Sequence, residues 1–213
     1  MAPRIPPTTC RAIARGVFGA GTLPGAHPDV ITQCMTDQTI RFTARLRATK
    51  RRTILQLPGA ESKKLPSRGQ VAVHGIINGQ VFQTVLEPDG DFGHWMNVNH
   101  KLQTAAGLRA GDTATVEIAP TKEWPEPRVP PDLRKALAEA PQKIRALWDV
   151  ITPMARWEWV RWVSATNNPG TRQRRVEVSI SKLSGGKGRP CCFNRAACTD
   201  PDLSKNGKLV GDA

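Results

Sequence analysis

Hydrophobic and polar residues alternate without interruption from Gln38 to Arg47. One set of alternate positions is apolar and the other is polar and mostly basic: Ile40, Phe42, Ala44 and Leu46 against Arg41, Thr43, Arg45 and Arg47. Successive side chains of a β-strand point to opposite faces of the sheet. The pattern therefore predicts a strand with one face in a core and the other face strongly basic.

Short apolar runs separated by turn residues continue to residue 119. They predict further strands at residues 53–57, 71–77, 81–86, 94–99 and 113–119. Asn78-Gly79 predicts a tight hairpin, because both residues tolerate a positive φ. Residues 101–106 predict a short helix that ends at Gly107. Six short strands with tight turns predict a small barrel or sandwich domain over residues 37–119.

The periodicity becomes helical in the second half. Residues 120–131 contain five prolines and predict an extended linker. Apolar residues then recur at helical spacing, first at Leu133, Leu137 and Ala140 and next at Ile144, Leu147 and Val150. Thr152-Pro153 is typical of a helix start, and Thr171 is expected to cap a last helix. The sequence therefore predicts a helical segment over residues 132–193, and the fold class is α+β.

Neither end of the chain shows a regular pattern. Residues 1–34 are rich in proline, glycine and arginine, so we expect a disordered extension, with Met35 as an alternative start. A chain that begins at Met35 should then be as stable as the full chain. Arg15 and Pro24 interrupt the apolar stretch that a secretory signal needs, which favours a cytoplasmic protein. Residues 194–213 are expected to be a disordered tail.

The charge balance changes what these elements could bind. The chain of 213 residues has 31 Lys and Arg against 18 Asp and Glu, a formal charge of +13. No apolar stretch approaches the roughly 18 residues of a membrane-spanning helix. The excess charge favours an anionic partner and repels a cationic antimicrobial peptide. Nucleic acid and anionic envelope components both fit this description, and the oligomeric state is left open.

Two arginine groups are candidates for binding a polyanion, because guanidinium forks match phosphate groups. One lies on the first strand and in the turn after it, and the other lies on the last helix: Arg41, Arg45, Arg47, Arg51 and Arg52, and then Arg172, Arg174 and Arg175. The alternative interpretation of both groups is a solvated surface with weak ion pairs.

An enzyme is the less favoured alternative. Asp91, His94 and His100 are close in sequence and are candidates for the rim of a ligand site. No nucleophile with a spaced partner accompanies them, so we assign no catalytic residue. The five cysteines lie near the two ends and have no histidine partner at zinc-ligand spacing, so neither a metal nor another cofactor is expected.

Several short motifs occur in an order that resembles a known bacterial family. They are GIING at residues 75–79, KLQTAAG at 101–107, GD at 111–112, VPPDL at 129–133 and GRPCCF at 188–193. The chain resembles the YdeI or OmpD-associated (bacteriocin-protection) family, in which a small β-barrel domain of unknown function precedes a helical segment. This resemblance implies a double-split barrel related to the AbrB-like fold and a role in resistance to antimicrobial peptides. Thr166 and Gly170 depart from it, because family members usually have Lys and Glu at these two places.

We therefore expect a non-catalytic protein that binds an anionic partner in a stress or peptide-resistance context. The alternative is a small-molecule-binding barrel or enzyme that uses Asp91, His94 and His100. Fold kinship cannot decide between them, since function belongs to sites rather than to scaffolds.

Overall fold

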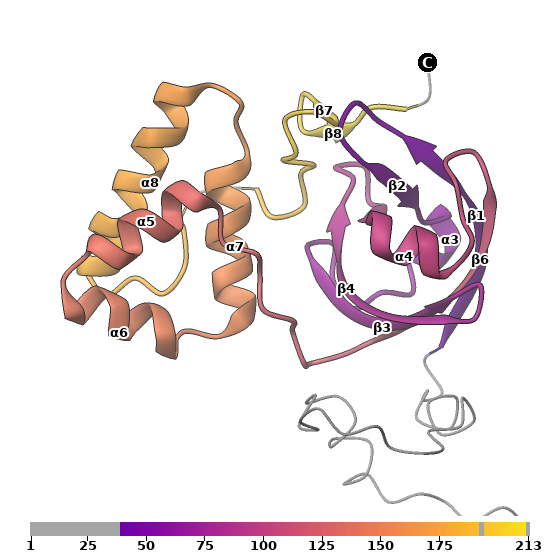
Figure 1. Ribbon diagram of the computed structural model, residues 1–213, viewed down its shortest axis with the longest axis horizontal. Coiled ribbons are helices and arrows are strands. Elements are labelled where there is room, and N and C mark those ends of the chain that lie inside the picture. The colour runs from indigo at the N-terminus through magenta and orange to yellow at the C-terminus, as the bar shows by residue number, and fades with distance from the viewer. Residues whose placement is uncertain (1–38, 192–193, 212–213) are drawn as a thin grey trace, which may run out of the picture. The chain divides into compact units, whose positions relative to one another are not determined.

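The computed structural model describes residues 39–191 and 194–211 (Figure 1). The predictions for residues 1–34 and for a start at Met35 lie outside the described residues.

Six antiparallel strands close into a barrel. They are β1 (Ile40–Ala48), β2 (Thr53–Gln56), β3 (Val71–Ile77), β4 (Gln80–Pro88), β5 (His94–Asn97) and β6 (Thr113–Pro120). The order around the barrel is β1-β2-β5-β4-β3-β6. β6 pairs with β1, so that Ile40 lies opposite Ile118 and Phe42 lies opposite Val116. The predicted α+β class, a small barrel followed by helices, is confirmed.

The barrel core follows from the alternation in β1. Ile40, Phe42 and Leu46 are buried, whereas Arg41 and Arg45 are exposed. Tight packing also depends on Gly75 of β3, because a Cβ atom there would lie 2.6 Å from the Phe82 ring. The Phe82 ring therefore fills the space that this glycine leaves.

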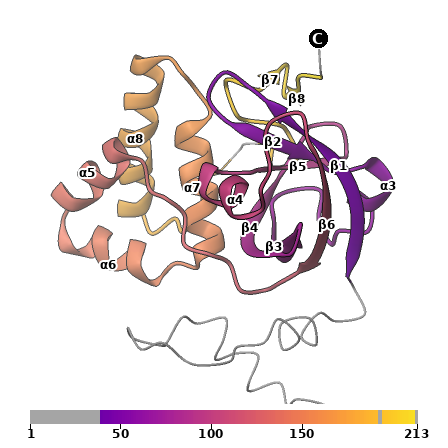
Figure 2. The same ribbon diagram turned by 45° about the vertical axis from the view of Figure 1, so that its right-hand side comes forward.

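Two short helices accompany the barrel. Leu102 of α4 (His100–Ala105) and Ala106, the residue after this helix, pack against the core, and Figures 1 and 2 show α4 beside the strands. Its start is capped by Asn99, whose side chain accepts a hydrogen bond from the Leu102 backbone N–H. Gly107, with φ +64°, follows its end, as the sequence predicts. The other helix, α3 (Gly59–Ser62), was not predicted, and it carries the buried Ser62.

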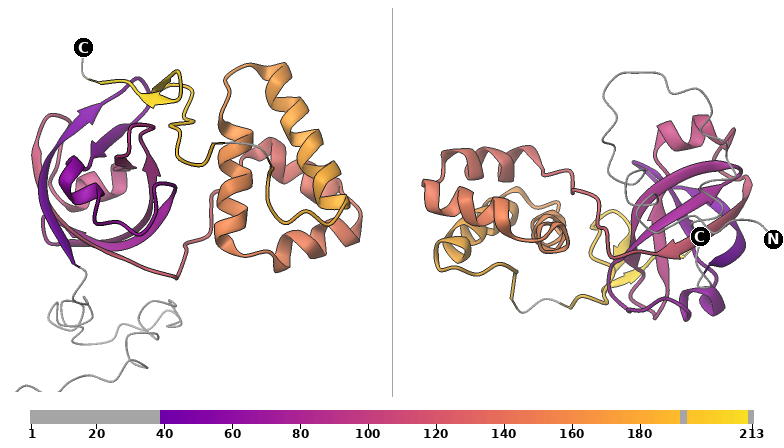
Figure 3. Two further views of the ribbon diagram at one scale, coloured as in Figure 1. Left: turned by 180° about the vertical axis from the view of Figure 1, so that it is seen from behind. Right: turned by 90° about the horizontal axis from the view of Figure 1, so that it is seen from below.

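Four helices form the second core. They are α5 (Pro131–Glu139), α6 (Gln142–Val150), α7 (Pro153–Ser164) and α8 (Pro169–Ser184), seen from behind in Figure 3. Leu133, Trp159 and Leu183 are almost completely buried among them. The expected cap at Thr171 is wrong, because the Asn168 side chain accepts the hydrogen bond that begins α8. Val150 is 77% exposed, so the apolar face of α6 ends before it.

The proline-rich residues 121–130 form no helix or strand. Two α7 side chains fix this stretch. The Trp157 indole donates to the Pro125 carbonyl (2.7 Å), and Arg156 pairs with Glu126 (2.6 Å).

The expectation of a disordered tail is wrong for residues 194–211, here called the C-terminal segment. It contains the hairpin of β7 (Ser204–Lys205) and β8 (Lys208–Leu209), which lies near β2 in Figures 1 and 2. Cys198 and Leu203 are buried in a cluster with Ile54 and Trp95 of the barrel. Such isolated apolar residues leave no periodic signal, since only the barrel surface supplies their partners.

Candidate functional site

The structure does not bring Asp91, His94 and His100 together as a ligand rim. His94 is 0% exposed. Its Nδ1 lies 2.6 Å from the Ser62 hydroxyl, and its Nε2 lies 2.9 Å from the Gly69 carbonyl oxygen. Burial lowers the pKa of His94, which keeps the imidazole neutral. His94 therefore joins α3 to β5 inside the fold, and the prediction that it lies at a rim is wrong.

The other two members of that group lie in different surroundings. Asp91 is exposed and accepts a hydrogen bond from Lys208 at 2.8 Å. This contact raises the pKa of Lys208. His100 is the exposed first residue of α4, and β5 ends at Asn97, so His100 does not continue the strand face of His94.

The three β1 arginines point away from the core, as the alternation predicts, but each has a neighbour. Arg41 pairs with Glu117 on β6 at 3.2 Å. Arg45 donates from Nε to the Gly111 carbonyl at 2.9 Å. Arg47 is half-buried and donates from Nη1 to the Val210 carbonyl at 2.5 Å. Among these three, Arg45 contacts a neutral group while remaining exposed, so its charge is still available to an anion.

The two arginines of the β1–β2 turn face carboxylates of the C-terminal segment. Arg52 Nη1 lies 2.8 Å from Asp200, and Arg51 Nε lies 3.4 Å from Asp202. Both carboxylates belong to residues for which the sequence predicts disorder. Sequence reasoning missed this pairing, although two acidic residues at spacing two could have suggested a match to adjacent arginines.

The α8 arginines also differ from one another. Arg172 makes a bidentate contact with Asp132 at 2.6 and 3.0 Å, and its hydrogen bonds lower the pKa of that carboxyl. Arg175 donates to the Trp162 carbonyl at 2.9 Å and stacks over the Trp162 ring, and burial lowers its pKa. Arg174 is exposed and pairs with no Asp or Glu of the described residues. These arginines do not form one uniform anion clamp.

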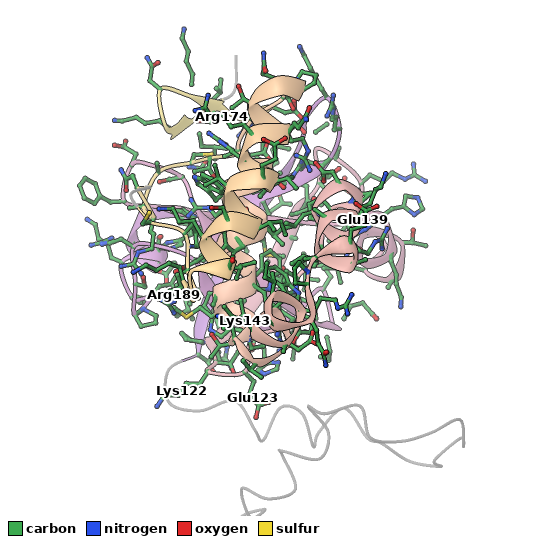
Figure 4. The ribbon with its side chains drawn as sticks, turned by 90° about the vertical axis from the view of Figure 1, so that its left-hand side faces the viewer. Lys122, Glu123, Glu139, Lys143, Arg174 and Arg189 are labelled. Carbon is green, nitrogen blue, oxygen red and sulfur yellow. The ribbon has the colours of Figure 1, made fainter. Side chains whose placement is uncertain are left out.

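Arg174 belongs to a wider basic face of the helical region. Figure 4 looks onto α8, with Arg174 near one end of the helix and Lys143 and Arg189 around the other. Lys143 is exposed and has no carboxylate partner within residues 39–191 and 194–211. Arg189 and Arg195 share the single carboxylate of Glu158, each at 3.6 Å, which leaves one positive charge in excess. We call Lys143, Arg174 and Arg189 the helical basic face.

A cavity of about 310 Å³ lies where β4 and β5, α7 and the C-terminal segment meet. Its wall includes a buried ion pair that the sequence did not reveal, Arg161 to Glu87 at 3.0 Å. Burial raises the pKa of Glu87, and the nearby Arg161 opposes this shift. Arg161, a residue of α7, also donates to the backbone carbonyls of Arg195 and Ala197, so it joins the C-terminal segment to Glu87 of the barrel.

The cavity also contains two tryptophans with different roles. The Trp157 indole N–H donates a hydrogen bond to the Pro125 carbonyl. Trp95 is 4% exposed, and its buried Nε1 has no hydrogen-bond acceptor among the described residues. A buried donor without an acceptor is unfavourable and can be satisfied by a ligand or by water. Trp95 was not singled out from the sequence, because a single tryptophan in a strand normally indicates core packing.

Two global properties bear on these sites. Within the part of the chain that the structure describes, no three His, Cys, Asp or Glu side chains are grouped as a metal ion would need. The described helices include none that is long and apolar enough to cross a membrane.

Two parts of the chain match known protein families. Residues 42–118, which span most of the barrel, match a domain of unknown function (DUF1905). Residues 126–186, which contain α5 to α8, match the family described as bacteriocin-protection, YdeI or OmpD-associated. No curated protein matches the chain. Both regions match in the order that the motifs predict, so the predicted resemblance to the bacteriocin-protection, YdeI or OmpD-associated family is confirmed.

Proposed function

We propose that this protein is a non-catalytic binding protein whose exposed basic side chains engage an anionic partner. The family description supports a context of bacteriocin protection or a related stress. The observation that carries the proposal is the helical basic face, where Lys143 and Arg174 are exposed without a carboxylate partner in the described residues. Both side chains reach solvent, so they can contact phosphate groups of nucleic acid or of an anionic envelope component.

The charge distribution around this face supports the same proposal. Residues 120–193 contain fourteen Lys and Arg against seven Asp and Glu. One of these carboxylates, Asp132, is already bound by Arg172, and Glu158 is shared between two arginines. The helical region therefore has more exposed positive charge than its own carboxylates neutralise, and such a surface attracts polyanions from solution.

The test measures binding to duplex DNA, to single-stranded RNA and to vesicles containing anionic lipid, each across a range of salt concentration. Replacing Lys143, Arg174 and Arg189 by Gln should flatten the log-log salt dependence for DNA by roughly 0.9 per lost phosphate contact. The matched control replaces three exposed basic residues of the barrel, Lys63, Lys101 and Arg109, and lowers the net charge equally.

If the control flattens the slope as much as the helical variant, binding follows net charge alone and the helical basic face is not the site. Absence of measurable binding to all three probes in the parent protein would remove the anionic-partner function. Preference for DNA, RNA or vesicles identifies the source of the phosphate groups.

A second candidate function is the binding of a small molecule in the cavity beside Trp95. Its support is the buried Trp95 Nε1, which could donate to an acceptor atom of a ligand. A cavity of this size is within the ordinary range for small ligands. Thermal melts with a panel of uncharged aromatic heterocycles test it, and a hit should raise the melting midpoint. The shift should disappear in Val160→Phe, which narrows the cavity, and persist in Val150→Phe at an exposed position.

A further inference from the structure

The C-terminal segment contacts the turn between β1 and β2 at two arginines and the end of β1 at a third. Asp200 contacts Arg52, Asp202 contacts Arg51, and the Val210 carbonyl accepts from Arg47. These arginines are three of the five that the sequence proposes for polyanion binding on the barrel. Two carboxylates and one backbone carbonyl of the chain itself thus already contact this surface.

Each of the two carboxylates is also oriented by a hydrogen bond from a group other than its arginine. One oxygen of Asp200 accepts from the Asp202 backbone N–H (3.0 Å), and the other faces Arg52. One oxygen of Asp202 accepts from the Asn167 side chain (2.8 Å), and the other faces Arg51. Each carboxylate therefore uses one oxygen to fix its position and the other to bind a guanidinium. Phosphate groups of a polyanion bind guanidinium groups through the same kind of charge-assisted contact.

The segment is attached to the barrel independently of these ion pairs. Leu203 and Cys198 pack on Ile54 and Trp95, and the Leu209 backbone N–H donates to the Asp89 carbonyl at 2.6 Å. Gly90 brings the two backbones together, because a Cβ atom there would collide with the Gly207 carbonyl. The segment can therefore stay attached when its two carboxylates lose their partners.

The arginine side chains of these pairs remain partly accessible, whereas the carboxylates do not. The side chains of Arg51 and Arg52 are 67% and 34% exposed, and those of Asp200 and Asp202 are each 13% exposed. A guanidinium has five N–H donors, and a single carboxylate oxygen uses few of them. An incoming anion can approach Arg51 and Arg52 from solvent, but it meets charges that the segment has already neutralised.

We propose that the carboxylates of Asp200 and Asp202 in the C-terminal segment are an intramolecular ligand of the β1–β2 turn, and that they compete with the external anionic partner for Arg51 and Arg52. This inference rests on the proposed function and concerns how strongly the barrel contributes to it. The segment weakens binding at the barrel and leaves the helical basic face as the main contact. Loss of its carboxylates turns the barrel surface into a second contact.

The experiment compares the full chain with the double variant Asp200→Asn/Asp202→Asn. The probe is a fluorescently labelled DNA duplex, followed by anisotropy at several salt concentrations. The double variant should bind more tightly at low salt, and its log-log salt slope should steepen by roughly 0.9 for each of the two phosphate groups that Arg51 and Arg52 then bind. The matched control, Glu123→Gln/Asp149→Asn, raises the net charge equally at carboxylates that form no ion pair with a Lys or Arg of the described residues. Its slope should stay at the parent value.

A second comparison shows whether the effect passes through the arginines. In a chain that carries Arg51→Gln and Arg52→Gln, the two Asp→Asn substitutions should leave the slope unchanged. Circular dichroism and thermal melts confirm that each variant is folded. If the double variant is unfolded at the assay temperature, the single variants Asp202→Asn and Asp149→Asn are compared instead. The log-log salt slope of Asp202→Asn should then steepen by roughly 0.9, and that of Asp149→Asn should stay at the parent value.

Equal slopes in the double variant and its control overturn the competition, even when the parent binds DNA through the helical basic face. If the parent does not bind but the double variant does, the proposed function of the helical basic face fails, whereas the competition at Arg51 and Arg52 is supported. If the parent and every variant fail to bind DNA, RNA and anionic vesicles, the proposed function fails and this inference fails with it.

Discussion

The barrel and the helical region both carry clustered arginines, but different groups surround them. On the barrel, Arg41, Arg51 and Arg52 each lie within 3.4 Å of a carboxylate, two of which belong to the C-terminal segment. In the helical region, Arg174 and Lys143 are exposed with no such partner in the described residues. The density of basic residues in a sequence therefore says little about available charge, because carboxylates that are distant in the sequence can neutralise it.

The largest expected effect concerns the residue that fastens the C-terminal segment to the barrel. Arg161→Ala should lower the free energy of unfolding by about 3 to 5 kcal/mol, because it leaves the buried Glu87 carboxylate without its partner. Urea unfolding measures this loss. Arg174→Ala is the exposed control and should change stability by no more than about 0.5 kcal/mol. Similar losses in the two variants would contradict the difference between the α7 arginine that is buried against a barrel carboxylate and the exposed arginine of α8.

Leu203→Ala tests the packing of the same segment. Leu203 is 4% exposed among Ile54, Trp95 and Cys198, so truncation should cost about 2 to 4 kcal/mol. Val210→Ala, at a position that is 47% exposed, serves as the control and should cost no more than about 0.5 kcal/mol. A negligible effect of Leu203→Ala would mean that the segment does not cover the barrel in solution.

A fall in pH should lower the stability of the barrel and of the helical region over different pH ranges. In the barrel, the group that responds is His94. Its pKa is lowered by burial, so below about pH 6.5 the unfolded chain takes up a proton that the folded barrel does not. Stability should then fall as the pH falls, by up to about 1.4 kcal/mol per pH unit for this one group. His94→Gln should be less stable than the parent at neutral pH, but its stability should no longer fall with pH in this way. Urea unfolding at several pH values measures this dependence. The exposed His100→Gln should keep it.

The smallest expected effect is at the Arg172 to Asp132 pair in the helical region. This pair is partly exposed, so Arg172→Gln should cost only about 0.2 to 1 kcal/mol at pH 7. The folded pKa of Asp132 is lowered, so the contribution is present above about pH 3.9 and is lost as the pH falls through the folded value. The parent and the variant should therefore converge in stability only in strong acid. Convergence already at pH 5 would contradict the assignment to Asp132.

Much of the fold could be predicted because its signals are local. The alternation at residues 40–46 identified the buried face of β1, and Asn78-Gly79 identified the β3–β4 hairpin, where both residues have positive φ. Motif order predicted the family and the order of its two regions. These features depend on neighbours in sequence, which pattern analysis reads directly.

The candidate sites were harder to predict because each depends on residues that are far apart in the chain. Asp91, His94 and His100 are close in sequence, yet one is buried and two are exposed. Glu87 and Arg161 come from β4 and α7, and no local pattern links them. Adjacency along the chain was therefore a poor guide to shared chemistry.

The sequence by itself determined the strand and helix periods, the resemblance to a known family and the excess of positive charge. Only the tertiary structure decided which arginines keep that charge available. The reason is physical, because an ion pair forms only where the fold brings a carboxylate within a few ångströms of a basic group. Leu203 and Cys198 are buried against the barrel, and this packing places Asp200 and Asp202 next to the two arginines of the β1–β2 turn.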